Sequence, residues 1–78
     1  MPYIKEESRV IARVLPNTAG ELNYAITMLC LEYISRKGEC YQSYNDVIGV
    51  LECSKAEQQR RWVGPYEDIK IKQNGDIV

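Results

Sequence analysis

Residues 20–31, GELNYAITMLCL, carry apolar side chains on two opposite sides of the helix that they are predicted to form. At 100° per residue, one broad face of this helix consists of Leu22, Ala25, Ile26, Leu29, Cys30 and Tyr33. The opposite face consists of Tyr24, Met28 and Leu31. Because apolar surface of this extent is unusual on a soluble monomer, other segments or another chain must cover both faces. This requirement constrains the rest of the fold.

The ends of this helix are marked by capping signals. Thr18 followed by Glu21 is a capping box, which predicts a helix start at about Ala19. Arg36 and Lys37 favour the C-terminal end of the helix dipole, and Gly38 can adopt the left-handed conformation that closes a helix.

A short amphipathic helix is predicted before it, within residues 6–15. Its residues at helical spacing are Glu6, Glu7, Val10, Ile11, Val14 and Leu15. Acids in the first turn and Arg13 near the end suit the helix dipole. Pro16 ends this helix, since the residue before a proline is disfavoured in the α region.

A third, long helix is predicted to start at about Tyr44, because Ser43 and Asp46 form a second capping box. One side of it consists of Tyr44, Val47, Ile48, Leu51 and Trp62, and the other carries the small residues Gly49, Cys53 and Ala56. A glycine inside a helix costs about 1 kcal/mol relative to alanine. Gly49 therefore indicates either a close approach of another backbone or a tolerated surface glycine.

Gly64-Pro65 stops or kinks this helix, and the segment PYEDIKIKQNGDIV that follows is ambiguous. Early acids, late lysines and a leading proline favour a short helix to about Gln73, with Asn74-Gly75 as its stop. The alternation from Ile69 to Lys72 before Asn74-Gly75 would also suit a hairpin. The helix is favoured because a lone two-stranded hairpin is only marginally stable.

These elements predict a single all-α domain over residues 1–78. It would contain two long antiparallel helices, a short N-terminal helix and a short C-terminal element. A chain of 78 residues is near the size at which one core leaves little net stability, so association is a plausible source of further stability.

Composition argues against several classes of function. Ten basic and 11 acidic residues give a net charge of −1, which provides no electrostatic footprint for nucleic acid or an anionic membrane. The polar N-terminus does not resemble a signal peptide, and the uncharged stretch from Leu22 to Leu31 is far shorter than the roughly 20 residues that span a bilayer. We therefore expect a cytoplasmic protein.

The cysteine pattern does not predict a metal site or a disulfide framework. Cys30, Cys40 and Cys53 form no Cys-x-x-Cys pair, their number is odd, and the chain has no histidine. We expect three reduced thiols, no metal and no cofactor. With no histidine to act as base and no Gly-x-Ser-x-Gly turn, no catalytic residue is predicted either.

Several segments together resemble a known family. They are GELNYAIT (20–27), YQSYNDVIGVLEC (41–53), the pair Arg60-Arg61, and the ending PYEDIKI followed by NGDIV, with MPYIK at the start. They are similar to a family of short uncharacterised proteins of phage and bacterial genomes, which carries no known activity. A phage setting would imply a small interaction role, such as binding a host protein or sequestering a small molecule.

The best polar candidate for a binding site is the basic end of the third helix. Arg60 and Arg61 suit a phosphate or carboxylate, and Tyr24, Tyr44 and Tyr66 could stack on a small anionic ligand such as a nucleotide. In the alternative interpretation, the arginines complement the helix dipole and pair with Glu57 or Glu67.

A second hypothesis is a minimal metal-dependent hydrolase that resembles helical nucleotide pyrophosphatases. It would use Glu32, Asp46 and Glu52 to hold magnesium. Helix capping and ordinary solvation account for the acidic residues as well, and neither long helix repeats acids three residues apart. The leading hypothesis is therefore a non-enzymatic binding protein.

Self-association follows from the doubly apolar helix. We expect a homodimer or larger assembly. Its interface would contain Tyr24, Met28 and Leu31, together with Gly49 and Cys53 of the small-residue strip.

Overall fold

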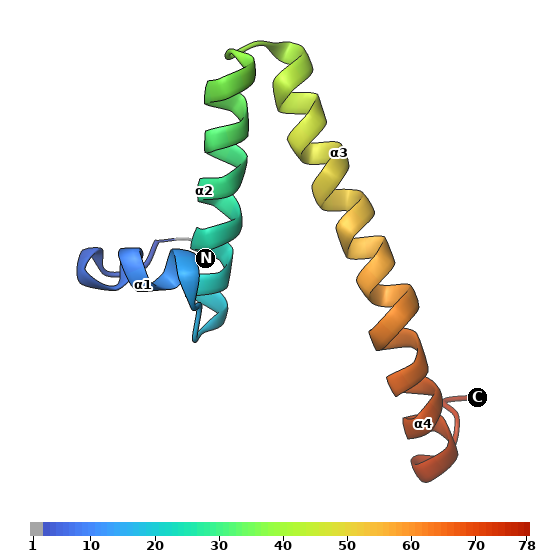
Figure 1. The fold of residues 1–78 in the computed structure, drawn as a ribbon. Coiled ribbons are helices and arrows are strands. Elements are labelled where there is room, and N and C mark those ends of the chain that lie inside the picture. The colour runs from blue at the N-terminus through green and yellow to red at the C-terminus, as the bar shows by residue number, and fades with distance from the viewer. Residues whose placement is uncertain (1–2) are drawn as a thin grey trace. The chain divides into compact units, whose positions relative to one another are not determined.

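The computed structural model describes residues 3–78, and over this range every regular element is a helix. The elements are the 3₁₀ turn η1 (Glu6–Ser8), α1 (Arg9–Val14), α2 (Ala19–Lys37), α3 (Tyr41–Gln58), the π-helical turn η2 (Gln59–Val63) and α4 (Gly64–Asn74) (Figure 1). The predicted all-α class is confirmed. The chain divides into two compact units, Met1–Val47 and Ile48–Val78.

In the first unit, α1 crosses and packs against α2 (Figure 1). The buried apolar residues at this contact are small: Ala12 is 0% exposed and Ala25 is 8% exposed. Arg13 of α1 donates a hydrogen bond to Glu32 of α2 and forms an ion pair with it. Small residues let the two helices approach closely, so this contact is tight but buries little apolar area.

The face of α2 that α1 covers differs from the predicted one. Met28 is half-buried on the side shared by Ala25 and Glu32, whereas Leu22 and Leu29 of the predicted core face are 50% and 66% exposed. The α1 contact therefore lies at the border of the two predicted faces, because it covers Ala25 of one face and Met28 of the other, while Leu31 of the second face stays 51% exposed. A short helix that docks through Ala12 fits best where its arginine meets Glu32, and helical periodicity alone does not contain that information.

The boundaries of α2 agree with the predicted signals. The Thr18 side chain accepts a hydrogen bond from the Glu21 backbone N–H at 3.1 Å, and the Glu21 carboxylate accepts one from the Asn17 N–H at 2.8 Å. At the other end, Gly38 has a φ of 95° and its N–H bonds to the Ile34 carbonyl. These contacts satisfy backbone groups that the helix ends would leave unpaired.

The predicted start of α3 is three residues late. Tyr41, not Tyr44, is the first residue of the helix. Ser43 does not cap from outside, because it lies within the first turn and its hydroxyl reaches back to accept from the Cys40 N–H at 3.2 Å. Asp46 therefore has no capping role, and its carboxylate binds Tyr33 and Gln42 instead. The spacing of Ser43 and Asp46 imitates a capping box one turn too far along.

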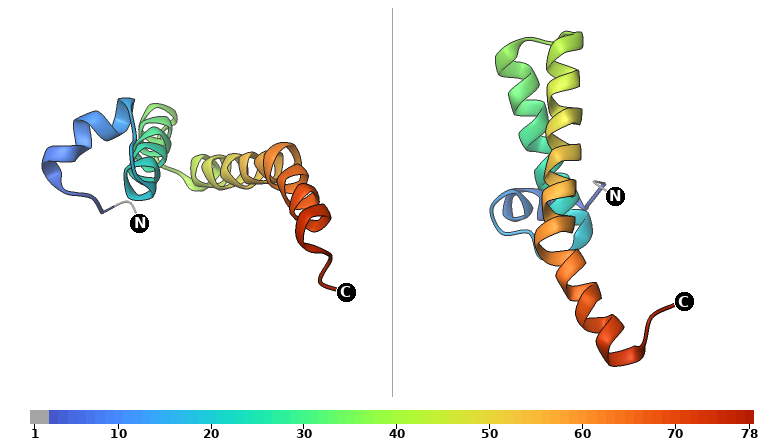
Figure 2. Two further views of the ribbon diagram at one scale, coloured as in Figure 1. Left: turned by 90° about the horizontal axis from the view of Figure 1, so that it is seen from below. Right: turned by 90° about the vertical axis from the view of Figure 1, so that its right-hand side faces the viewer.

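The second unit is one nearly uninterrupted helical run from the later part of α3 through η2 and α4 (Figure 2). The helix expected over the C-terminal segment is confirmed and the hairpin is not formed, since α4 ends at Asn74. Gly75 follows with a φ of 87°, and its N–H bonds to the Ile71 carbonyl. Pro65 occupies the first turn of α4, where its missing N–H is tolerated.

The π-helical turn η2 is explained by the Gly64-Pro65 pair. A proline within a continuous helix lacks an N–H and its ring clashes with the carbonyl four residues earlier, here that of Arg61. The helix widens instead, and the Gly64 N–H bonds to the Gln59 carbonyl, five residues back. A Cβ at position 64 would lie 3.2 Å from that same oxygen, so glycine relieves crowding there.

Burial distinguishes the two units. Within residues 3–78 the buried residues are Ala12, Ala25 and Ser43, all in the first unit. Every residue of the second unit is exposed, including Ile48, Leu51, Trp62, Val63, Tyr66, Ile69 and Ile71. The second unit thus has helical structure without a core of its own.

Candidate functional site

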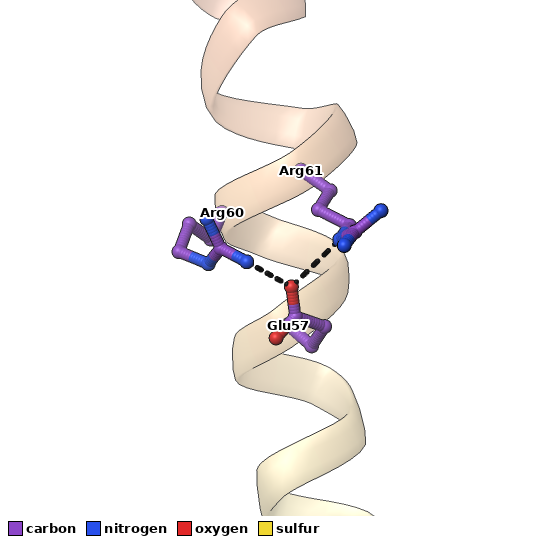
Figure 3. Close-up of polar contacts among 3 residues, drawn as sticks. All are labelled: Glu57, Arg60 and Arg61. Atoms are coloured by element: carbon purple, nitrogen blue, oxygen red, sulfur yellow. Dashed lines mark hydrogen bonds and ion pairs between the residues drawn. The ribbon is translucent and has the colours of Figure 1, made fainter.

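The charged cluster at η2 consists of Glu57, Arg60 and Arg61 (Figure 3). Arg60 Nη2 donates to Glu57 Oε1 at 2.5 Å, and Arg61 Nε donates to the same oxygen at 2.9 Å. The three residues lie three and four positions apart, so they are neighbours on the helix surface. Their side chains are largely exposed, and such pairs contribute only ~0–1 kcal/mol.

Pairing with Glu57 is the alternative to anion binding that the sequence offers for Arg60 and Arg61. Both guanidinium groups lie on one carboxylate oxygen, so a phosphate would have to compete with Glu57 for them. The other oxygen, Glu57 Oε2, takes part in none of the hydrogen bonds found among residues 3–78.

The predicted stacking tyrosines are divided between the two units. Tyr24 and Tyr44 belong to the first unit, where Tyr24 is half-buried on α2, while Tyr66 belongs to the second. A hydrogen bond to Glu39, reinforced by desolvation, raises the pKa of Tyr44 above its usual value. Lys70 Nζ lies 5.5 Å from the centroid of the Tyr66 ring, a cation–π distance. In the second unit, Tyr66 is close in sequence to Arg60 and Arg61, but its ring already has Lys70 as a cation–π partner.

A polar cluster that sequence reasoning missed joins α2 to the start of α3. Tyr33 donates its hydroxyl proton to Asp46 Oδ2 at 2.8 Å, and Gln42 Nε2 donates to Asp46 Oδ1 at 2.7 Å. The hydrogen bond to Asp46 raises the pKa of Tyr33, and the bonds from Tyr33 and Gln42 lower the pKa of Asp46. The contact fixes the α2–α3 corner, and only the tertiary structure reveals it.

The corner also places Cys40 at the N-terminus of α3. The backbone N–H of Ser43 and the Ser43 hydroxyl bond to the Cys40 sulfur and lower the pKa of the thiol. The Ser43 hydroxyl lies 2.8 Å from the Gly38 carbonyl oxygen and 3.0 Å from that of Cys40. Ser43, only 2% exposed, thus ties three backbone groups of the turn together. All three cysteines are free thiols.

An apolar groove of roughly 350 Å³ lies between α1 and α2. It is lined by Val10, Arg13, Val14, Ala25 and Leu29. Arg13 already pairs with Glu32, so the groove offers apolar surface and one partly engaged guanidinium. Val10, Val14 and Leu29 remain largely exposed along it.

The acidic residues of the hydrolase hypothesis are each engaged elsewhere. Glu32 pairs with Arg13, Asp46 binds Tyr33 and Gln42, and Glu52 Oε1 lies 3.7 Å from Lys55 Nζ. Across the described part of the chain, no three acidic or cysteine side chains come together in a way that could hold a metal ion.

The small-residue strip has open space around it within the chain. A Cβ added to Gly49 would meet no atom within 4 Å, and Cys53 is exposed. The close backbone approach that Gly49 suggested is therefore not made by this chain itself. Leu31, on the other predicted interface, is 51% exposed.

Among the helices of residues 3–78, none has the length and apolar character needed to cross a membrane.

Comparison with known proteins identifies a family but no activity. Neither the curated proteins nor the solved structures contain a match to this chain. A family model described as a domain of unknown function (DUF6899) matches residues 1–77, which is nearly the whole chain. The chain therefore belongs to this family of uncharacterised proteins, DUF6899.

Proposed function

We propose that this chain is a small self-associating, non-enzymatic interaction protein whose exposed helical surfaces bind a second copy and a further partner. The observation that carries the proposal is the second unit, in which a helical run from Ile48 to Asn74 buries none of its residues. Helices in proteins owe most of their stability to the packing of an apolar face. A helical unit with exposed Leu51, Trp62 and Tyr66 thus calls for a packing partner.

The first unit offers a second apolar surface. Leu29 of α2 lines the groove between α1 and α2. Three further apolar residues of α2 are exposed, namely Leu22, Ile26 and Tyr33. Exposed apolar patches of this kind mark interaction sites on soluble proteins. The interface predicted from sequence shifts accordingly, because Tyr24 and Met28 are half-covered within the chain and leave less surface for a partner.

The further partner is a host protein if the chain acts in a phage setting, as the family resemblance implies. A small anionic ligand at Arg60 and Arg61 is the less supported target, because both arginines are engaged by Glu57. No observation among the acidic residues favours the hydrolase.

Sedimentation velocity from micromolar to hundred-micromolar concentration tests self-association. We expect a concentration-dependent dimer or larger species, with helix content by circular dichroism rising as the dimer forms. A monomer throughout this range would overturn the proposal. A thermal-shift assay with a nucleotide panel, with and without magnesium, tests the ligand. A magnesium-independent shift that Arg60→Ala abolishes would restore the anion site.

A further inference from the structure

Four exposed apolar side chains of the second unit are arranged symmetrically about the bond between Gln58 and Gln59. Ile48 and Ile69 lie equally far from this bond along the chain, and so do Leu51 and Tyr66. All four side chains are exposed in the chain. Two such helices that run in opposite directions would bring Ile48 opposite the partner's Ile69 and Leu51 opposite the partner's Tyr66.

We propose that the second units of two copies pair as antiparallel helices across a twofold axis at Gln58–Gln59. The inference rests on the self-association proposed above and names its geometry. In a twofold interface the same patch serves both subunits, so Leu51 packs on Tyr66 of the partner subunit and Tyr66 on the partner's Leu51.

Charge and aromatic positions favour the antiparallel direction over the parallel one. Antiparallel pairing sets Lys55 opposite Trp62 of the partner subunit. This is a cation–π pair, a type that this chain already forms between Lys37 and Tyr33 at 5.9 Å. Parallel pairing would set Lys55 against the same lysine of the partner subunit, a like-charge contact that is destabilising.

The spacing of the stripe is that of helix pairs. From Ile48 through Leu51, Lys55 and Gln58 to Trp62 the steps alternate between three and four residues, as in a coiled-coil seam. The step from Trp62 to Tyr66 is four where the alternation calls for three.

The π-helical turn Gln59–Val63 overlaps the start of this irregular step and takes up one extra residue. Gly64 and Pro65, which produce the turn, are thus positioning residues for Tyr66. The polar residues Lys55 and Gln58 lower the stability of the seam but fix its register. At 1.5 Å per residue the stripe from Ile48 to Gln73 extends roughly 38 Å, between three and four heptads.

Disulfide trapping in the full chain tests the direction of pairing. The three native cysteines are first replaced (Cys30→Ala, Cys40→Ser, Cys53→Ser), and the resulting chain must sediment like the wild type. Leu51→Cys and Tyr66→Cys are then made as separate proteins in this background, mixed, and oxidised with glutathione disulfide. We expect a covalent dimer in the mixture and little in either protein alone. Val50→Cys, on an exposed position away from the stripe, replaces Leu51→Cys as the matched control and should link at least tenfold less.

The outcomes separate the two proposals. Linking of Leu51→Cys to itself would show parallel pairing and overturn the antiparallel inference alone. A dimer in solution without linking between positions 51 and 66 would place the interface elsewhere, for example on the groove between α1 and α2. A wild-type monomer would overturn self-association itself. As an independent check, Lys55→Glu should weaken dimerisation by about tenfold or more, and an unchanged dimerisation constant would contradict the contact with Trp62 of the partner subunit.

Discussion

The two units contain the same kind of secondary structure but differ in how it is held. In the first, α1 packs on α2 through Ala12 and Ala25, and buried Ser43 ties the corner to α3. In the second, α3, η2 and α4 continue into one another and no residue is buried. Helical propensity and capping can define a helix, but only side-chain packing holds it cooperatively in one place. The proposed self-association is therefore assigned to the second unit, where the apolar residues are exposed.

The largest expected effect comes from enlarging a buried alanine. Ala12→Leu adds three carbons where the side chain is 0% exposed, so it should cost ~1–3 kcal/mol of unfolding free energy through overpacking. Ala56→Leu, at an exposed position of the second unit, is the control and should change stability by less than about 0.5 kcal/mol. Urea denaturation measures both. Equal losses would mean that the second unit is packed as tightly as the first.

Removal of a serine hydroxyl should also lower the stability more in the first unit than in the second. Ser43→Ala leaves the Cys40 N–H without its acceptor in a buried turn, at a cost of ~1–2 kcal/mol. Ser54→Ala removes only an exposed contact with Gln58 and should be close to neutral. Both are measured by the denaturant midpoint. A neutral Ser43→Ala would show that water replaces the hydroxyl and that the corner is looser than its burial implies.

Replacement by alanine should affect helix stability differently at the two helical glycines of the second unit. Gly49→Ala meets open space and removes a poor helix former, so it should stabilise by up to ~1 kcal/mol. Gly64→Ala brings a Cβ within 3.2 Å of the Gln59 carbonyl and should lose that gain or destabilise. Thermal melts followed by circular dichroism, combined with sedimentation, measure helix stability and association. If Gly49→Ala abolishes association, the small-residue strip is an interface after all.

The smallest effect concerns pH and the Tyr33–Asp46 contact. The pKa of Asp46 is lowered in the fold, so its contribution to stability is present above its ordinary value of 3.8 and is lost as the pH falls through the lower folded value. The pKa of Tyr33 is raised above 10.0, so its contribution is present below that value and is lost as the pH rises through the folded value. Asp46→Asn should flatten both limbs of a plot of denaturant midpoint against pH. Asp68→Asn in the second unit should not, and identical profiles for the two variants would contradict the contact.

Local chemistry made several elements predictable. Pro16, Thr18 with Glu21, Gly38 and Gly75 act within one turn of themselves, and the ends of α1, α2 and α4 lie where these residues indicate. The choice of helix over hairpin for the C-terminal segment was also local, since Pro65 suits a first helical turn. The charged cluster at η2 also depends on near neighbours in the sequence. Arg60 and Arg61 lie beside Glu57 at the spacing of helix neighbours, a pairing that the sequence already offered as the alternative to anion binding.

The sequence by itself determined that this chain is helical, where most of its helices begin and end, and that it has more apolar surface than its own length can cover. The tertiary structure decided which face of α2 receives α1, that Asp46 binds Tyr33 instead of capping a helix, and that α3 begins at Tyr41. Capping and propensity depend on neighbours a few residues away, so they can be read from sequence. The choice between two apolar faces depends on contacts such as Ala12 with α2 and Arg13 with Glu32, whose partners are far apart in the chain and meet only after folding.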